Sequence, residues 1–248
     1  MTDGCGRTID YLRLSVTDRC NYRCRYCMPE EGVCKREHRE MLTLEELAEV
    51  AAAFVVCGVR KIRLTGGEPL VRRGIVELCR QLRAIPDLRE LCLTTNGSLL
   101  PDLAAPLRAA GVDRLNISLD TLRPERFAQM TRLGQLSDVL EGIRAAEDAG
   151  FRDLKFDTVL IGGFNDDEIA DFAALTRDHP WEMRFIELMP MGPCADWDRA
   201  CFLSADTVLE RLPELEQIES SGVARRYRLP GAAGTIGLIS PMSHDFCA

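Results

Sequence analysis

The sequence predicts an α/β fold, a partial TIM-type barrel of six β/α units followed by a short C-terminal extension. Short runs rich in β-forming residues alternate with segments of helical periodicity as far as about Leu188. This alternation implies parallel strands with right-handed crossovers, in either an open doubly wound sheet or a barrel. A closed eight-fold barrel typically takes about 250 residues, and these six units use only part of the 248-residue chain. We therefore expect a partial barrel.

The expected elements follow from local patterns. The clearest helix begins at Thr43, which forms a capping box with Glu46, and it ends at Gly58. Its 3.6-residue period predicts a buried face of Leu44, Leu47, Ala51 and Phe54. The six expected strands span residues 10–17, 61–65, 91–95, 114–119, 154–161 and 183–188.

The chain is predicted to divide into a barrel at residues 1–189 and an extension at residues 190–248. The β/α rhythm is lost from Pro190 onward, where the runs YRL and TIGLI are typical of short strands. In barrels and doubly wound sheets, functional loops follow the carboxyl ends of the strands. The loop after residues 10–17 is therefore the first candidate for a site.

Composition and charge exclude several classes of function. The net charge of -8 argues against a surface that binds nucleic acid, because such affinity comes mainly from basic patches. The N-terminus does not resemble a signal peptide, and no apolar run reaches the length of a membrane span. We expect a cytoplasmic protein with no membrane partner. Its eleven cysteines then indicate reduced thiols or metal ligands.

Three cysteines fall within eight residues of the loop after the first strand, at Cys20, Cys24 and Cys27. Three thiolates suit an iron-sulfur cluster or zinc, and a 4Fe-4S cluster held by three cysteines keeps one iron open. The alternatives are a zinc site closed by Cys34, or coincidence in a cysteine-rich chain. A turn containing Pro29 and Gly32 makes Cys34 the weaker candidate.

The run CNYRCRYC resembles the signature of the radical S-adenosylmethionine (SAM) superfamily. The chain as a whole is similar to the GTP 3′,8-cyclase family of molybdenum cofactor biosynthesis, through GRTIDYLRLSVTDRCNYRCRYCMP, KIRLTGGEPLVRR, LTTNG, LNISLD, GFND and RFIELMPMG. This resemblance implies a 4Fe-4S cluster whose open iron binds SAM. It also implies a lyase in which a radical made from SAM takes hydrogen from the ribose of GTP, after which the nucleotide cyclises. A reductant must supply the electron.

Four residues are expected to hold SAM. The run TGGEP ends the second strand, and its glycines let the backbone approach a ligand closely, although a plain turn is the alternative. Tyr26 lies between two of the cysteines, with packing as its alternative role. The resemblance implies that Gly67 binds the SAM amino group and that Tyr26, Ser118 and Met189 also contact SAM.

Charged residues interrupt several of the β-rich runs, at Arg13, Arg63, Lys155 and Arg184. One such residue is usually a salt-bridged core charge, and Asp157 is a candidate partner of Lys155, but several in one barrel favour a polyanionic small molecule. The resemblance implies that Arg13, Arg63, Thr94 and Lys155 bind GTP. The role of Arg184 stays open.

The family also carries a second 4Fe-4S cluster near its C-terminus, and this chain reaches only the first of the three cysteines, Cys247. We therefore expect a C-terminally truncated cyclase with one complete cluster site and a second, incomplete one. The alternatives are a radical SAM enzyme for another anionic substrate, and a non-catalytic module that holds zinc or an inert cluster. The sequence leaves the electron donor and the oligomeric state open, with a homodimer as one alternative.

Overall fold

The computed structural model describes residues 2–4, 6–33 and 40–244. It divides into two compact units: unit 1 contains residues 1–21, 33–116 and 137–151, and unit 2 contains residues 22–32, 117–136 and 152–248. None of the helices in the described ranges combines the length and apolar character that crossing a membrane requires. The division at 189 and 190 stays a prediction.

A mainly parallel sheet carries the fold, as the sequence predicted. Its strands follow the hydrogen-bonded order β1-β2-β3-β4-β5-β6-β9-β8-β7. The strands are β1 (Tyr11–Ser15), β2 (Lys61–Thr65), β3 (Glu90–Thr95), β4 (Arg114–Ser118), β5 (Lys155–Leu160), β6 (Glu182–Glu187), β7 (Glu216–Ser221), β8 (Ala224–Arg228) and β9 (Thr235–Ile239). The α-helices are α1 (Leu44–Val56), α2 (Ile75–Arg83), α3 (Leu100–Ala109), α4 (Pro124–Thr131), α5 (Leu136–Asp148), α6 (Ile169–Leu175) and α7 (Thr207–Arg211). The 3₁₀ turns are η2 (Pro69–Val71), η3 (Asp166–Glu168), η4 (Gly192–Cys194) and η5 (Arg199–Cys201).

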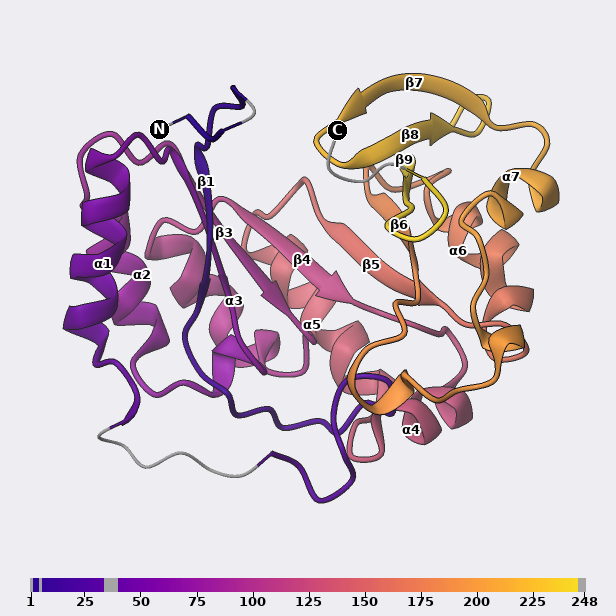
Figure 1. Ribbon diagram of the computed structural model, residues 1–248, viewed down its shortest axis with the longest axis horizontal. Helices are drawn as coiled ribbons and strands as arrows, with labels where there is room; N and C mark the ends of the chain where they lie inside the picture. The colour runs from indigo at the N-terminus through magenta and orange to yellow at the C-terminus, as the bar shows by residue number, and fades with distance from the viewer. Residues whose placement is uncertain (1, 5, 34–39, 245–248) are drawn as a thin grey trace. The chain divides into compact units, whose positions relative to one another are not determined.

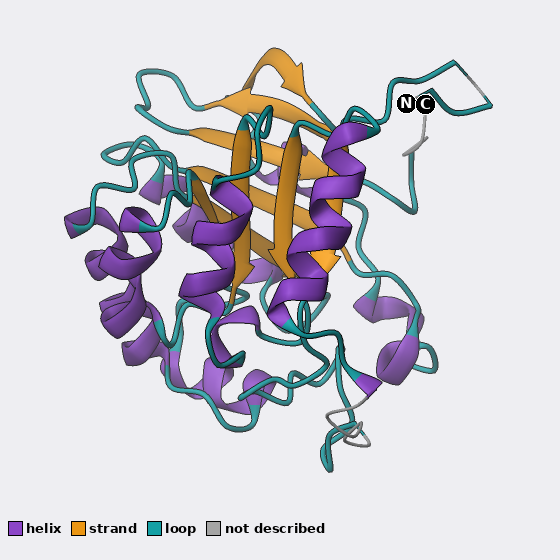
Figure 2. Cartoon of the chain, turned by 90° about the vertical axis from the view of Figure 1, so that its left-hand side faces the viewer, coloured by secondary structure: helices purple, strands orange, loops and turns teal. Residues whose placement is uncertain are grey.

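In unit 1, β1, β2 and β3 pair in parallel, and α2 packs against both β3 and α1. The apolar centre of β2 is fully buried at Ile62 and Leu64, as expected of a parallel strand covered on both faces. Figure 1 shows α1 and α2 lying beside each other, and in Figure 2 helices lie in front of the strands. Because the strands are parallel, their carboxyl ends share one edge.

The first helix confirms the expected N-terminus and corrects the expected buried face. Thr43 caps α1, and both hydrogen bonds of the capping box with Glu46 are formed. The residues that α1 buries are Leu47, Ala51 and Val55, whereas Phe54 is 37% exposed. These buried residues are spaced four apart, which keeps them on one stripe of the helix, and Phe54 lies beside that stripe.

In unit 2 the C-terminal strands continue the sheet. The strand β9 pairs in parallel with β6, and β8 and β7 follow in antiparallel order. The runs YRL and TIGLI contribute to β8 and β9, which confirms the two predicted strands, whereas β7 was not predicted. Its sequence, EQIESS, carries little of the apolar alternation that identifies a strand.

One face of β5 and β6 is polar. In β5, Phe156, Thr158 and Leu160 are buried, and the alternate residues Lys155 and Asp157 are half-buried. Successive side chains of a strand point to opposite faces, so the charged residues of β5 share one face. A strand face that packs in the core is apolar, whereas this face carries charged residues. It is therefore suited to a polar ligand.

Candidate functional site

Arg63 lies at the centre of a hydrogen-bonded cluster in unit 1. Its side chain is only 8% exposed. Its Nε donates to the Tyr11 hydroxyl at 2.7 Å, and its Nη1 donates to Asn116 Oδ1 at 2.7 Å and to Thr94 Oγ1 at 3.2 Å. The structure therefore brings together two predicted substrate residues, Arg63 and Thr94. These three partners are neutral, so these bonds fix the guanidinium without cancelling its charge.

Arg13 lies next to Arg63 on the neighbouring strand. The register of β1 and β2 places Arg13 opposite Arg63, and paired residues of adjacent strands present their side chains on the same face. Arg13 is exposed, whereas Arg63 is buried. Two like charges on one face repel each other unless an anion lies between or beside them, which favours an anionic ligand here.

The Gly-Gly turn after β2 is required by the backbone of unit 1 itself. A Cβ atom on Gly66 would lie 2.4 Å from the Thr17 carbonyl oxygen, and one on Gly67 would lie 2.3 Å from the Arg19 carbonyl oxygen. The amides of Gly67 and Glu68 donate to those carbonyls, each at 2.8 Å. The glycines thus hold the segment that leads into Cys20 against the end of β2. The contact of Gly67 with SAM stays a prediction.

A buried carboxylate joins the loops after β2 and β3. Glu68 is 1% exposed and accepts hydrogen bonds from Thr95 Oγ1 at 2.8 Å, from the Asn96 amide at 2.6 Å and from the Leu70 amide at 2.9 Å. Burial raises the pKa of Glu68 above its ordinary value, and these donors oppose the shift. Asn96 in turn donates to Asn21 Oδ1 at 2.8 Å. The residue that follows Cys20 is therefore fixed to this edge of unit 1.

The other two cysteines of the loop lie in unit 2, in a tight turn. The amides of Cys27 and Met28 both donate to the Cys24 carbonyl at 2.9 Å. The amides of Arg23 and Arg25 donate to carbonyls at the end of α4, each at 3.0 Å. This pairing holds the turn on α4 and presents Cys24 and Cys27 from a single helical turn.

Tyr26 hydrogen-bonds to a buried aspartate at the end of β4. Its hydroxyl donates to Asp120 Oδ2 at 2.8 Å, and the Val159 amide donates to Asp120 Oδ1 at 2.9 Å. Burial, aided by the charge of Asp120, raises the pKa of Tyr26 well above its ordinary value. Burial raises the pKa of Asp120 to about 6, against the opposing hydrogen bonds of Val159 and Tyr26. Tyr26 is thus held in position between the two cysteines of the turn.

The donor set of the loop fits an iron-sulfur cluster. Cys20, Cys24 and Cys27 form no disulfide within the described residues, and Cys27 is exposed. Burial and the charge of Asp120 raise the pKa of the Cys27 thiol, so metal binding there must displace a proton. Among residues 2–4, 6–33 and 40–244, no three His, Cys, Asp or Glu side chains are grouped as a metal site. Cys20 belongs to unit 1 and the other two cysteines to unit 2. Cys247, the predicted ligand of a second cluster, lies outside the described residues.

The remaining predicted SAM residues occupy strand ends in unit 2. Ser118 is the last residue of β4 and is half-buried. Met189 follows β6 and is 38% exposed. Both positions follow the rule that ligands bind at the carboxyl ends of parallel strands. Their contacts with SAM stay predictions.

The predicted substrate residue Lys155 lies beside Glu182, its partner in the parallel register of β5 and β6. The Lys155 Nζ lies 3.0 Å from Glu182 Oε2. Arg184 Nε also donates to Glu182, and its Nη1 lies 3.9 Å from Asp157 Oδ1. The register places Glu182 opposite Lys155, and the candidate pairing of Lys155 with Asp157 stays a prediction. Glu182 therefore lies beside both Lys155 and Arg184.

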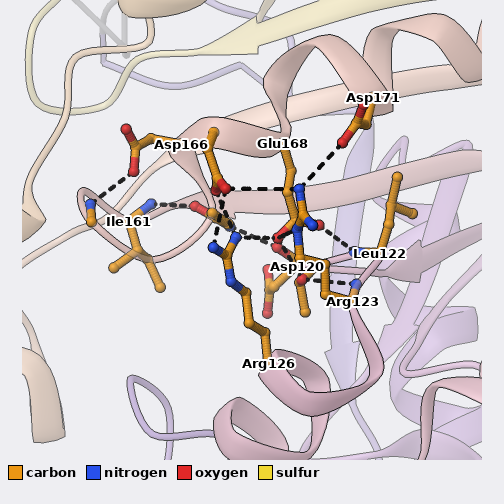
Figure 3. A network of polar contacts seen from close by, with 12 residues as sticks. Asp120, Leu122, Arg123, Arg126, Ile161, Asp166, Glu168 and Asp171 are labelled. Carbon is orange, nitrogen blue, oxygen red and sulfur yellow. Dashed lines mark hydrogen bonds and ion pairs between the residues drawn. The ribbon is translucent and has the colours of Figure 1, made fainter.

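A second buried glutamate clamps the loops of unit 2, as Figure 3 shows. Glu168 is fully buried and accepts from Thr121 Oγ1 and from the Leu122 amide, each at 2.7 Å. Arg126 Nη1 lies 2.8 Å from Glu168 Oε1 and 2.6 Å from Asp167 Oδ1. This clamp repeats the pattern of Glu68 with Thr95 and Asn96. It holds the loop after β4, which carries Asp120.

Sequence reasoning missed most residues that position the site. The missed residues are polar side chains whose partners lie far along the chain: Tyr11, Asn21, Glu68, Asn96, Asn116, Asp120, Asn165, Glu168 and Glu182. One signal was available for some of them. Glu68, Asn96, Asn116, Asp120 and Asn165 lie inside the quoted runs TGGEP, LTTNG, LNISLD and GFND, where polar residues directly follow or interrupt strands.

Sequence comparison defines the class of this protein. Residues 14–176 match the radical SAM superfamily, and residues 181–248 match the family described as Molybdenum Cofactor Synthesis C. The three-cysteine loop and the strands β2 to β5 lie within the first match. The chain therefore belongs to the radical SAM superfamily.

The comparison with curated proteins identifies the particular family. The chain is 55% identical over 251 residues to the GTP 3′,8-cyclase of Peptoclostridium acidaminophilum, covering 100% of this chain and 77% of that protein. It is 54% identical to the GTP 3′,8-cyclase of Pseudomonas entomophila and 51% identical to that of Geobacter sulfurreducens, with 100% of this chain and 76% and 77% of those proteins covered. Within the superfamily, this chain is a member of the GTP 3′,8-cyclase family. It spans about three quarters of the length of these relatives.

Solved structures support the fold. Methylornithine synthase (PylB) is similar with a TM-score of 0.65 and 17% identity, covering 82% of this chain and 60% of that one. SuiB of Streptococcus suis, bound to its precursor peptide SuiA, is similar with a TM-score of 0.62 and 15% identity, covering 83% of this chain and 44% of that one. These likenesses confirm the α/β fold with a parallel sheet.

Proposed function

We propose that this chain converts GTP to (8S)-3′,8-cyclo-7,8-dihydroguanosine 5′-triphosphate, a step of molybdenum cofactor biosynthesis, with a 4Fe-4S cluster and SAM. One observation carries the proposal, namely the 55% identity with a GTP 3′,8-cyclase along the whole chain, which includes the three-cysteine loop. The described residues are consistent with this proposal, since they provide the three loop cysteines, a fixed aromatic residue between two of them, and the buried guanidinium of Arg63.

Cys20, Cys24 and Cys27 would hold the cluster, and Tyr26, Gly67, Ser118 and Met189 would hold SAM. When bound, these groups supply the one-electron chemistry that begins the reaction. The protein contributes the placement of the ligands. Glu68 and Asn96 support the segment around Cys20, and Asp120 supports Tyr26.

The substrate would be held through its phosphates by Arg13, Arg63 and Lys155, with Thr94 as a hydroxyl donor. Arginine forks match phosphate oxygens, and a buried guanidinium with neutral partners keeps its charge for a ligand. Arg63 meets this description in the structure. Fixed phosphates limit the motion of the ribose, and correct placement of the reacting atoms contributes strongly to rate.

Anaerobic incubation of the reconstituted protein with SAM, a reductant and GTP tests the proposal. The expected products are 5′-deoxyadenosine and the cyclised nucleotide, both measured by liquid chromatography with mass spectrometry. The matched control is Cys24→Ala, which should yield neither. Production of 5′-deoxyadenosine with GTP unchanged would instead support a radical SAM enzyme for another anionic substrate. Bound zinc without iron after reconstitution would support a non-catalytic module.

A further inference from the structure

In unit 2, one row of paired residues crosses four strands of the sheet, and three of its four residues are charged. The register places Asp157 of β5 opposite Arg184 of β6, Arg184 opposite Gly237 of β9, and Gly237 opposite Arg226 of β8. Residues paired across strands present their side chains on one face of the sheet. Arg226, which no part of the sequence reasoning identified, therefore shares a face with Arg184 and with Lys155, two residues before Asp157 on β5.

Gly237 leaves room between the two arginines. A Cβ atom at Gly237 would lie 3.2 Å from Arg184 Cγ and 3.6 Å from Glu182 Oε1. The first contact is tighter than ordinary van der Waals distance, so any larger residue would displace the Arg184 side chain. The absence of a side chain on β9 thus lets cations from β6 and β8 approach the same carboxylate, Glu182.

Three cations on this face lie near one carboxylate, Glu182. Lys155 Nζ lies 3.0 Å from Glu182 Oε2, Arg184 Nε donates to Glu182 Oε1, and Arg226 Nε lies 3.6 Å from Glu182 Oε2. Burial alone would raise the pKa of Glu182, but the charges and hydrogen bonds of Arg184 and Lys155 hold it below its ordinary value. Glu182 is therefore ionised at neutral pH. Lys155, Arg184 and Arg226 therefore share this one ionised carboxylate, and Arg184 also lies 3.9 Å from Asp157 Oδ1.

Arg226 also has one buried hydrogen-bond donor that is unsatisfied among the described residues. Its Nε is buried and makes no hydrogen bond within the described part of the chain, because Glu182 at 3.6 Å is beyond hydrogen-bond distance. Its Nη2 makes only a long hydrogen bond of 3.4 Å, to Thr235 Oγ1. A buried donor without an acceptor is unfavourable, and an anionic oxygen in this position would satisfy it.

We propose that Arg226 is a further substrate-binding residue, which contacts the phosphate groups of the nucleotide on the face that it shares with Lys155 and Arg184. This inference rests on the proposed function for the identity of the nucleotide. It adds a residue from the C-terminal strands to the ligands expected from the barrel. Glu182 is then a positioning residue, since it holds the three cations in one cluster without contacting the anion itself.

The test compares Arg226→Gln with Arg228→Gln. Arg228 lies two residues further along the same strand and on the same face, but its side chain is exposed and makes no ion pair or hydrogen bond within the described residues. Its substitution therefore removes the same charge and no contact with Glu182. Dissociation constants for GTP, inorganic tripolyphosphate and guanosine are measured by equilibrium dialysis with the anaerobically reconstituted protein. We expect Arg226→Gln to weaken GTP and tripolyphosphate binding about ten-fold and to leave guanosine binding unchanged. Arg228→Gln should change none of the three by more than about two-fold.

Equal dissociation constants for Arg226→Gln and Arg228→Gln would overturn the inference and leave Arg226 as a structural partner of Glu182. If Arg226→Gln does not fold, judged by circular dichroism, Arg226→Lys replaces it, since it keeps the charge but not the guanidinium fork. We then expect a smaller loss, about three-fold, for both phosphate ligands, and an unchanged affinity would again overturn the inference. If the wild-type protein binds tripolyphosphate but not GTP, the result would contradict the proposed function but support an anion-binding site at Arg226. Wild-type protein that binds neither would contradict both.

Discussion

The hydroxyl of Tyr26 donates a hydrogen bond of 2.8 Å to the carboxylate of Asp120, which lies 94 residues further along the chain. The other oxygen of Asp120 accepts from the amide of Val159, and the Asp120 carbonyl accepts from the Asn165 side chain at 2.7 Å. A single residue therefore links the cysteine turn to the ends of β4 and β5.

Loss of the Asp120 carboxylate should weaken SAM binding. Asp120→Leu removes the acceptor of Tyr26, so the aromatic ring is no longer fixed, and a hydrogen bond to a charged group contributes about 1.5 to 3 kcal/mol. We expect the dissociation constant for SAM, measured by equilibrium dialysis on reconstituted protein, to rise about ten-fold or more.

The matched control for this experiment is Asp120→Asn. An asparagine can accept from the Val159 amide through Oδ1 and donate to the Tyr26 hydroxyl through Nδ2, so the geometry is kept. Its SAM affinity should stay within about two-fold of wild type. Equal losses in both variants would show that the negative charge, and not the position of Tyr26, is what SAM binding requires.

The raised pKa of Asp120 predicts that the free energy of unfolding depends on pH. Burial raises the pKa of Asp120 from 3.8 to about 6, so the folded protein binds this proton more tightly than the unfolded chain does. Stability from this group is complete below pH 3.8 and is lost as the pH rises towards 6. Relative to wild type, metal-free Asp120→Asn should therefore gain up to about 3 kcal/mol of unfolding free energy between pH 4 and pH 7, at about 1.4 kcal/mol for each pKa unit.

Urea unfolding of both metal-free proteins at the two pH values measures this difference. A difference between variant and wild type that stays constant across this pH range would contradict a raised pKa of Asp120.

The cluster should depend on each of the three loop cysteines. Replacement of Cys20, Cys24 or Cys27 by alanine removes one ligand of a three-ligand site, and we expect the oxygen-sensitive 4Fe-4S absorption and the iron of that cluster to be lost after anaerobic reconstitution. Cys57→Ala is the control, because Cys57 is exposed at the end of α1. Retention of full iron content in any of the three loop variants would remove that residue from the ligand set.

Arg63 and Lys155 should contribute to GTP affinity. Arg63→Ala removes a buried guanidinium, and Lys155→Ala removes a cation of the Glu182 cluster. Each charge-assisted contact contributes about 1.5 to 3 kcal/mol, which corresponds to a ten- to hundred-fold weaker binding. Isothermal titration with GTP measures the effect, and Arg80→Ala, at an exposed surface ion pair, is the control. Unchanged GTP affinity in Arg63→Ala would make Arg63 a purely structural residue.

The buried clamp at Glu168 should contribute to stability. Glu168→Ala leaves the Thr121 hydroxyl and the Leu122 amide without their acceptor in a dry environment, at a cost of about 3 kcal/mol. Thermal unfolding should show a clear fall in melting temperature, whereas Asp171→Asn, at an exposed carboxylate paired with Arg123 at 3.8 Å, should have little effect. Similar melting temperatures for the two variants would mean that water or another donor replaces the clamp.

The sequence by itself determined the features that depend on neighbouring residues. The alternation of β-rich and helical segments fixed the parallel α/β fold, because strand and helix periods are local properties. Thr43 and Glu46 fixed the start of α1, since a capping box spans only four residues. The spacing of Cys20, Cys24 and Cys27 placed three soft ligands on one loop, and this prediction needed no tertiary structure.

Only the tertiary structure decided which distant side chains meet. Asp153 and Asp157 are the carboxylates nearest to Lys155 in the sequence. The register of β5 and β6 places Glu182, 27 residues away, opposite Lys155. In the same way, Gly237 separates Arg184 from Arg226 only because β9 lies between β6 and β8. Strand order and register are set by the burial of whole faces of the sheet, a global property. The partners of buried charges therefore cannot be predicted from a local pattern.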